Sequence, residues 1–210
     1  MKHIVFEGIS ASGKGTLIEK IKERLTEERI KFFVTEWNSF PITTKVIKKL
    51  KKDKKFNPET WSILHALDCY LRFISLPPDT EVVIWDRFVY TALSRDTLRG
   101  LPEQFVSDLY DFLPNPDLVF YLDIDLDTAF DRRKNRHKTF YYYSSGADIY
   151  SDKDMEQSWK KYNESLIAKY NEIFNKKGTD TIYIDATKSI TEKCSIINEK
   201  IAEVINDVKN

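Results

Sequence analysis

Short segments with the composition of buried strands alternate along this chain with longer segments of helical periodicity. Five segments are short and rich in β-branched and aromatic residues, and they comprise residues 2–7, 32–35, 81–85, 118–122 and 181–184. This alternation predicts parallel βαβ units with right-handed crossovers, and hence an α/β fold whose five-stranded parallel sheet is covered by helices on both faces. Ligands bind such sheets beyond the carboxyl ends of the strands, so residues just after Phe6, Val34, Trp85 and Leu122 are the first candidates for a site.

Helical patterns connect these strands. In residues 16–29 the side chains of Leu17, Ile18, Ile21 and Leu25 recur at helical spacing, while Lys and Glu occupy the other face. The remaining helical patterns cover residues 45–55, 58–76, 89–99, 102–112, 126–134, 152–175 and 190–208.

Length and composition favour a single domain over residues 1–210. The chain has 41% hydrophobic and 31% charged residues with only 6 Gly and 7 Pro, so it can bury a sizeable core. No stretch approaches about 18 uninterrupted apolar residues, and we expect neither a membrane span nor a signal peptide. With 33 basic and 33 acidic residues, the chain gives no indication of nucleic acid or membrane partners. Cys69 and Cys194 lack metal-type or redox-type spacing, which favours a cytoplasmic location.

A phosphate-binding loop follows the first strand. Residues 8–14 read Gly8-Ile9-Ser10-Ala11-Ser12-Gly13-Lys14, which matches G-x-x-x-x-G-K between a strand and a helix. In such a loop the backbone N–H groups point at phosphate oxygens, and the lysine adds a charge for the β- and γ-phosphates. The alternative is a Gly-Ser turn with a surface lysine. Gly15 stands where the strict motif has Ser or Thr, so a hydroxyl ligand for Mg²⁺ comes one residue later, at Thr16.

Asp86 and Arg87 come directly after the third strand and should emerge near this loop. An acid at this place can hold Mg²⁺ or its water shell, and an arginine can bind a phosphate through two hydrogen bonds. A surface ion pair at a strand end is the alternative. Arg95 and Arg99 lie on the following helix, near the same face.

A basic cluster ends the helix after the fourth strand, and a long loop follows it. The cluster consists of Arg132, Arg133, Arg136, His137 and Lys138, and the loop covers residues 139–151. Long loops in compact domains are often lids, and lid arginines can neutralise charge on a transferring phosphoryl group. Basic residues are also favoured at helix C-termini by the helix dipole alone, which is the alternative.

With these motifs in place, the chain resembles the thymidylate kinase family of P-loop nucleoside monophosphate kinases. The matching segments are Phe6-Glu7-Gly8, Glu36, Asp86-Arg87-Phe88, Pro116-Asp117-Leu118, Leu122-Asp123 and Ile184-Asp185-Ala186. The resemblance implies a three-layer P-loop kinase fold with a lid at about residues 136–151. It also implies ATP and Mg²⁺ as cofactors, a small-molecule nucleotide substrate and a homodimer.

The resemblance further implies roles for particular residues. ATP would bind residues 8–16, with its adenine near Asp185, Ala186 and Thr187. The loop residues that would contact ATP are Gly8, Ser10, Ala11, Ser12, Gly13, Lys14, Gly15 and Thr16. The acceptor monophosphate would bind Arg87 and a basic residue after Glu36, either Lys45 or Lys48, with Arg95 nearby. Thr16 and Asp86 are the candidate metal ligands.

The chain departs from the family where the base is read. His65 occupies the place of a stacking Phe and Cys69 that of a base-binding Arg, so Arg72, one turn further on, is the nearest substitute. His65 also fits a hydrogen-bonded helix histidine. Ser10 and Ala11 replace an acidic residue and, in some members, an arginine, so a catalytic arginine must come from Arg132, Arg133 or Arg136.

Three functions remain open. The first is phosphorylation of a nucleoside monophosphate by ATP, with dTMP the best single acceptor and an altered base preference as a variant of it. The second is phosphorylation of a nucleoside or another small alcohol, with Glu36 as general base. The third is a regulatory module that binds ATP without turnover.

Overall fold

Five parallel strands form the central sheet. The structure, a computed structural model, describes residues 1–53, 57–136, 139–150, 154–177 and 180–206. The strands are β1 (Lys2–Glu7), β2 (Phe32–Glu36), β3 (Val82–Asp86), β4 (Leu118–Asp123) and β5 (Thr181–Asp185). They lie in the order β2-β3-β1-β4-β5, and every neighbouring pair is parallel. The predicted five-stranded parallel sheet is therefore confirmed, with each strand within one residue of its predicted bounds.

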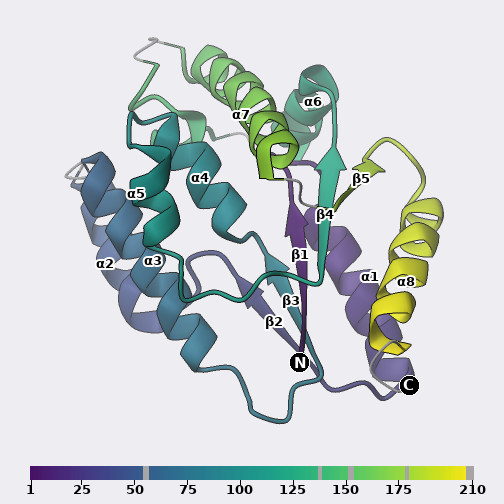
Figure 1. The fold of residues 1–210 in the computed structure, drawn as a ribbon. Coiled ribbons are helices and arrows are strands. Elements are labelled where there is room, and N and C mark those ends of the chain that lie inside the picture. Colours follow the sequence, from purple (N-terminus) through teal and green to yellow (C-terminus); the bar gives the residue numbers. More distant parts are fainter. Residues whose placement is uncertain (54–56, 137–138, 151–153, 178–179, 207–210) are drawn as a thin grey trace.

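Helices cover both faces of this sheet (Figure 1). Against one face lie α1 (Lys14–Glu27) and α8 (Ile190–Asn206). The other face carries α3 (Pro58–Ile74), α4 (Val89–Thr97), α5 (Glu103–Asp108) and α7 (Met155–Lys177). Helix α2 (Pro41–Lys52) packs beside α3, α6 (Leu126–Arg136) follows β4, and the short 3-10 helix η1 (Tyr143–Ser145) precedes α7. No helix in the described part of the chain is long and apolar enough to cross a membrane.

The central strand β1 shows how the two layers of core arise. Ile4 and Phe6 pack toward α1 and α8, whereas Val5 packs toward the opposite helices. Successive side chains of a strand point to opposite faces, so Glu7 lies on the same side as Val5, toward α4 and α7. Glu7 has no exposed surface. The last residue of an apolar strand is therefore a fully buried carboxylate.

Two helices differ from their predicted bounds by four residues at one end, and the other helices differ by three residues or fewer. Helix α2 begins at Pro41 rather than at residue 45, because proline suits the first turn of a helix, where its missing N–H is not needed. Helix α5 ends at Asp108 rather than at residue 112. Beyond it the chain continues in tighter turns, in which Tyr110 N–H donates to the Ser107 carbonyl at 2.9 Å.

The carboxyl ends of β1, β2 and β3 meet at one edge of the sheet. Phe6 pairs in register with Asp86, and Asp86 with Glu36. The chain leaves β1 through α1 on one face and leaves β3 through α4 on the other. This divergence makes a topological switch point between β1 and β3, the place where open α/β sheets bind ligands. Figure 1 shows α7 lying across the carboxyl ends of β1 and β4.

Gly146 is packed where no side chain fits. It follows η1 with a φ of 65°, in the left-handed region. A Cβ on this residue would lie 2.4 Å from Cγ of Tyr162 on α7. The loop before α7 therefore rests on that helix through a contact that requires glycine.

We expect Gly146→Ala to lower the free energy of unfolding by about 2 kcal/mol, because the methyl group overpacks the Tyr162 contact and alanine is strained at this φ. In a chain of this size that loss lowers Tm by roughly 6 °C, which scanning calorimetry resolves. Gly15→Ala is the matched control, since no atom lies within 4 Å of its Cβ position. Equal Tm values for the two variants would contradict the contact.

Candidate active site

The phosphate loop curls tightly between β1 and α1. Gly8, Ala11 and Gly13 have φ values of 139°, 65° and 100°, which give the loop its turns. The loop is pressed against β4, because a Cβ on Gly8 would lie 2.9 Å from the Leu122 carbonyl oxygen. The backbone at Gly8 can take this path only because glycine has no side chain.

Lys14 folds back over its own loop. Its Nζ donates hydrogen bonds to the carbonyl oxygens of Gly8 and Ile9 at 2.9 and 3.1 Å and to Ser12 Oγ at 3.3 Å. The side chain is buried. Burial, together with the nearby Arg87 guanidinium, lowers the pKa of Lys14 to about 7. Phosphate oxygens in the loop would supply the negative charge that this buried amine lacks.

Arg87 faces the loop from the end of β3. Its φ of 75° is in the left-handed region, and its backbone N–H is held by the Phe6 carbonyl at 3.0 Å. Its Nη1 donates to Thr91 Oγ1 at 3.2 Å and to the Tyr170 hydroxyl at 3.4 Å. A strained backbone held by its surroundings is typical of functional sites. Both partners of the guanidinium are neutral, so its charge remains available to an anion.

Arg95 adds a second cation one turn beyond Thr91. Its Nε is buried without a hydrogen-bond partner, and in the described part of the chain no carboxylate pairs with it. Burial and the Arg87 guanidinium lower the pKa of Arg95, with a further contribution from Arg99. Two neighbouring guanidiniums, one of them without a counterion, form a site suited to a phosphate.

Asp86 is suited to a divalent cation. Its Oδ1 is buried and accepts no hydrogen bond from any described residue, and its charge acts on Lys14. The described residues contain no group of three or more His, Cys, Asp or Glu that could hold a metal ion. Mg²⁺ needs no such cage, since one carboxylate with phosphate oxygens and waters is a usual ligand set. Asp86 thus fits Mg²⁺ carried by a nucleotide.

A cavity of about 620 Å³ lies on the other side of the phosphate loop. Its lining consists of Ala11, Gly13, Thr16, Arg132, Asn135, Arg136, Ile190 and Lys193. One wall is fixed by the Ala186 carbonyl, which accepts from Arg132 Nη2 at 3.1 Å and from Lys193 Nζ at 2.9 Å. Asp185 accepts from the backbone and hydroxyl of Thr187. The structure therefore brings Thr16, Arg132 and Arg136 together beside the loop, with residues 185–187 at the margin.

Arg133 points elsewhere. It is buried, donates to the Thr139 carbonyl at 2.7 Å and stacks over the Phe140 ring. Of the three arginines predicted for catalysis, Arg132 and Arg136 reach the cavity and Arg133 supports the loop that follows α6. His137, Lys138 and Ser151 lie outside the described residues.

On the acceptor side, the predicted lysines do not reach the arginines. Lys45 and Lys48 are exposed on α2, and Glu36 is exposed at the end of β2, next to Asp86. Lys51 is the lysine of α2 that turns inward, with Nζ 4.8 Å from the centre of the Trp61 ring. Burial and the charges of Arg95 and Arg99 lower the pKa of Lys51 to about 8.

The base-reading positions are buried. His65 is 1% exposed and lies between the rings of Trp37 and Trp61, and among the described residues neither ring nitrogen has a hydrogen-bond partner. Within the described part of the chain, the hydrogen bond required by the alternative of a hydrogen-bonded helix histidine is not made. Burial lowers the pKa of His65 well below its usual value, and Lys51 acts in the same direction, so the ring is neutral. Cys69 is fully buried as well.

Arg72 has structural partners. Its Nε forms a buried ion pair with Asp68 at 2.8 Å, and its Nη1 donates to Thr35 Oγ1 at 2.7 Å. Asp68 in turn accepts from Thr43 Oγ1 at 2.6 Å. These contacts tie α3 to β2 and α2. The Nη2 of Arg72 is buried and has no hydrogen-bond partner among the described residues, and the charge of Arg72 acts on His65 as those of Lys51, Arg95 and Arg99 do.

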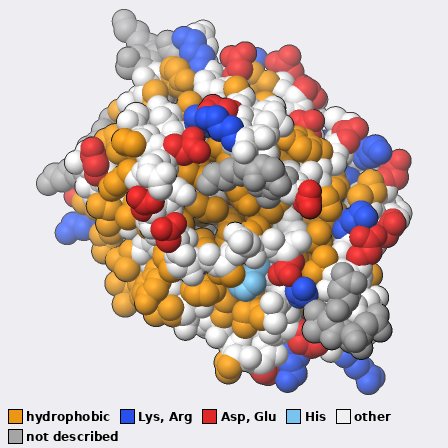
Figure 2. Space-filling model, in the orientation of Figure 1, with side chains coloured by type: hydrophobic (Ala, Val, Ile, Leu, Met, Phe, Trp, Pro, Cys, Tyr) orange, Lys and Arg blue, Asp and Glu red, His pale blue; other side chains and the backbone are white. Residues whose placement is uncertain are grey.

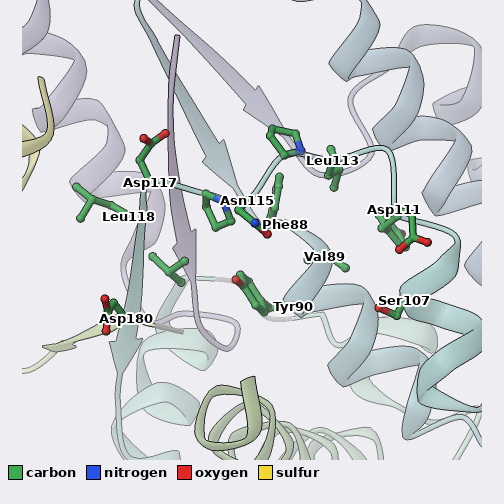
Figure 3. Close-up of a pocket in the computed structure, with 14 residues that line it drawn as sticks. Phe88, Val89, Tyr90, Ser107, Asp111, Leu113, Asn115, Asp117, Leu118 and Asp180 are labelled. Carbon is green, nitrogen blue, oxygen red and sulfur yellow. The ribbon is translucent and has the colours of Figure 1, made fainter. Parts of the chain in front are cut away.

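A larger cavity, of about 820 Å³, lies at the opposite edge of the sheet (Figure 3). It opens between α4, α5 and the start of β4, and Asp111, Asp117 and Asp180 are among its lining residues. Asp117 is already paired with Lys2 at 2.9 Å. The cavity contains no residue of the phosphate loop, so its size does not mark the nucleotide site.

No role was predicted from the sequence for Glu7, Lys51, Tyr170 or Lys193, although Glu7 stands in the matching segment Phe6-Glu7-Gly8. Glu7 carried a signal, because a charged residue ends an otherwise apolar strand. Lys51 was one of several lysines in a helical run, and only the packing of α2 on α3 selects it. Tyr170 and Lys193 had no distinguishing pattern.

Phosphates at this edge would meet cations from both sides of the switch point between β1 and β3. In a sheet of order β2-β3-β1-β4-β5 this is the arrangement of a P-loop phosphotransferase. Known proteins narrow the class further: residues 6–197 match the family described as thymidylate kinase, and the chain belongs to that family. The family resemblance expected from the sequence is confirmed.

Relatives match over nearly the whole chain. A protein of Saccharolobus solfataricus named "Probable thymidylate kinase 2" is 32% identical over 209 residues, which cover 97% of each chain. A "Probable thymidylate kinase" of Methanococcus maripaludis is 31% identical and covers 99% of this chain and 98% of its own. A relative of that name in Methanocaldococcus jannaschii is 28% identical, with coverages of 99% and 95%.

Lys51 should destabilise the free protein. Because its pKa of about 8 in the fold is below the unfolded value, the charged amine opposes folding at every pH below about 8, and the penalty disappears only as pH rises toward 10.5. We expect Lys51→Met, which keeps the stem over Trp61, to raise the free energy of unfolding at pH 7 by about 1 kcal/mol after allowance for solvent screening.

Denaturant unfolding at pH 7 and pH 10 measures this gain, which should shrink at the higher pH. Lys48→Met is the matched control, since Lys48 is exposed on the same helix. Equal stability changes in the two variants would show that Lys51 is not held against the arginines.

Proposed function

We propose that the protein transfers the γ-phosphoryl group of ATP to a nucleoside monophosphate, with dTMP as the first candidate acceptor. The observation that carries this is the placement of Lys14 and the Arg87–Arg95 pair on facing sides of the β1–β3 switch point. Their charges act on one another, since Arg87 and Arg95 both depress the pKa of Lys14. Two phosphate groups, one from each substrate, would neutralise these charges.

Each group then has a role. Lys14 and the loop N–H groups would hold the donor phosphates, Arg87 and Arg95 the acceptor phosphate, and Arg132 and Arg136 the donor nucleotide beside the loop. Asp86 would hold Mg²⁺, which when bound neutralises charge on the β- and γ-phosphates. An acceptor phosphate is already ionised at neutral pH, so no general base is required. Glu36 would orient the acceptor.

A nucleoside kinase is the weaker candidate. It needs a general base near the acceptor hydroxyl, and Glu36 is exposed next to Asp86. A neutral acceptor would also leave Arg87 and Arg95 without an anion, which costs binding free energy in a buried site. The two free cysteines support the cytoplasmic location that we propose.

ADP release in the presence of ATP and Mg²⁺ tests the function with a panel of nucleoside monophosphates, nucleosides and no acceptor. We expect monophosphates to be the best acceptors and nucleosides to be poor ones. Lys14→Ala should reduce kcat roughly 100-fold or more, because a preorganised charge on the transferring group is lost.

Two outcomes would contradict the proposal. Faster turnover of deoxynucleosides than of all their monophosphates would assign Glu36 as the base of a nucleoside kinase. ATP binding with background ADP release for every acceptor would indicate a regulatory module.

We also propose that the protein is a homodimer through α3 and α2. Ile63, Leu67, Tyr70 and Ile74 form one stripe along α3 and are 49%, 44%, 41% and 57% exposed. Ile42 and Val46 on α2 are exposed as well. Figure 2 shows hydrophobic side chains gathered on the side of the molecule where α3 lies. A self-complementary apolar stripe fits a second copy of the chain.

Leu67→Lys should convert a dimer into a monomer, because it puts a charge at the centre of the stripe. Sedimentation velocity measures the mass directly. Tyr183→Lys, at a 47% exposed position on the edge strand β5, is the control and should leave the dimer intact. A monomeric wild-type protein at micromolar concentration would contradict the proposal.

A further inference from the structure

The carboxylate of Glu7 is saturated by hydrogen bonds. Its Oε1 accepts from the backbone N–H groups of Phe88 and Thr91 at 2.8 and 3.0 Å. Its Oε2 accepts from Thr91 Oγ1 at 2.6 Å and from the Tyr170 hydroxyl at 2.9 Å. A carboxylate has about four lone-pair sites, and all are used. Glu7 therefore has no free position for a metal ion or for a substrate proton.

These four bonds join three parts of the protein. Glu7 ends β1 and directly precedes the phosphate loop, Phe88 and Thr91 form the start of α4, and Tyr170 lies on α7. The negative charge sits at the N-terminus of α4, where free N–H groups and the helix dipole favour it. The donor loop, the acceptor helix and α7 are thus fixed relative to one another by one side chain.

The directions of these hydrogen bonds also determine how the two hydroxyls contact Arg87. Thr91 Oγ1 and the Tyr170 hydroxyl lie 2.8 Å apart, and each lies within hydrogen-bond distance of Glu7 Oε2. The single proton of each hydroxyl is therefore used toward Glu7, and their lone pairs remain for Arg87 Nη1, which has only protons to offer. Burial and the Glu7 charge raise the pKa of Tyr170 well above its usual value, so the phenol stays protonated and can donate.

We propose that Glu7 is a positioning residue, which acts through the Thr91 and Tyr170 hydroxyls to set the orientation of the Arg87 guanidinium and with it the place of the acceptor phosphate. Its effect on the acceptor rests on the proposed function, in which Arg87 binds that phosphate. Glu7 itself touches neither substrate. Its removal would misplace a binding group rather than remove one, so the effect should fall on the acceptor and not on ATP.

Variants of the two hydroxyls test this without unpairing a buried carboxylate. We expect Tyr170→Phe and Thr91→Val each to weaken dTMP binding roughly fivefold, because each variant removes one hydrogen bond that orients Arg87. The affinity for ATP should stay at the wild-type value. Thr91→Ser keeps the hydroxyl and should restore dTMP affinity. Tyr110→Phe is the matched control, because the buried Tyr110 hydroxyl has no hydrogen-bond partner in the described part of the chain. Calorimetric titration of each ligand gives the affinities.

A double-mutant cycle with Arg87→Ala separates positioning from general loosening. If Tyr170 acts through Arg87, Tyr170→Phe should have no further effect on dTMP affinity in the Arg87→Ala background. The same fivefold loss in both backgrounds, or an equal loss of ATP affinity, would overturn the proposal. A wild-type protein that binds no nucleoside monophosphate would overturn the proposed function and this role together, whereas wild-type dTMP affinity in Tyr170→Phe would overturn the role alone.

Discussion

Mutual repulsion among buried cations is the constraint that shapes the carboxyl edge of the sheet. The charges of Arg87 and Arg95 lower the pKa of Lys14, and the charge of Arg87 lowers that of Arg95. Lys51 joins this group through Arg95 and Arg99. Such a group opposes folding unless negative charge is near it. The protein supplies part of that charge through Glu7, Asp86 and Asp148, which pairs with Arg99 at 2.7 Å. Bound phosphates would supply the rest, so substrate binding and stability are linked.

The repulsion between these cations explains why the residues that hold them come from different helices and loops. Each cation is held by a different part of the fold: Lys14 by the loop carbonyls, Arg87 by hydroxyls of α4 and α7, and Arg99 by Asp148 and the Tyr162 hydroxyl. A single flexible loop could not keep them apart at fixed distances. Glu7 links the two sides because it ends β1 at the one point where the phosphate loop, α4 and α7 meet.

The donor half of the site could be predicted more fully than the acceptor half. The phosphate loop is contiguous in sequence, and its turn residues and lysine act on one another locally, so their order indicates their geometry. The acceptor half depends on which face of α2 and α3 turns inward, and the arginines beside the donor loop depend in the same way on α6. Lys51 rather than Lys45 or Lys48 reaches the arginines, and Arg133 turns to Phe140 while Arg132 and Arg136 face the cavity. Arg72 is held by Asp68, and His65 is enclosed by Trp37 and Trp61.

The sequence by itself determined the parallel sheet, the strand bounds, the phosphate loop and the Asp86-Arg87 pair at the switch point, because periodicity and motif spacing are local properties. Only the tertiary structure decided the partners of each charged side chain. Side chains one turn apart on a helix differ only slightly in direction around the helix axis. Packing against other elements therefore determines which of them is exposed and which is buried. For that reason the saturated carboxylate of Glu7, which joins residues 163 positions apart in the chain, became visible only in the folded protein.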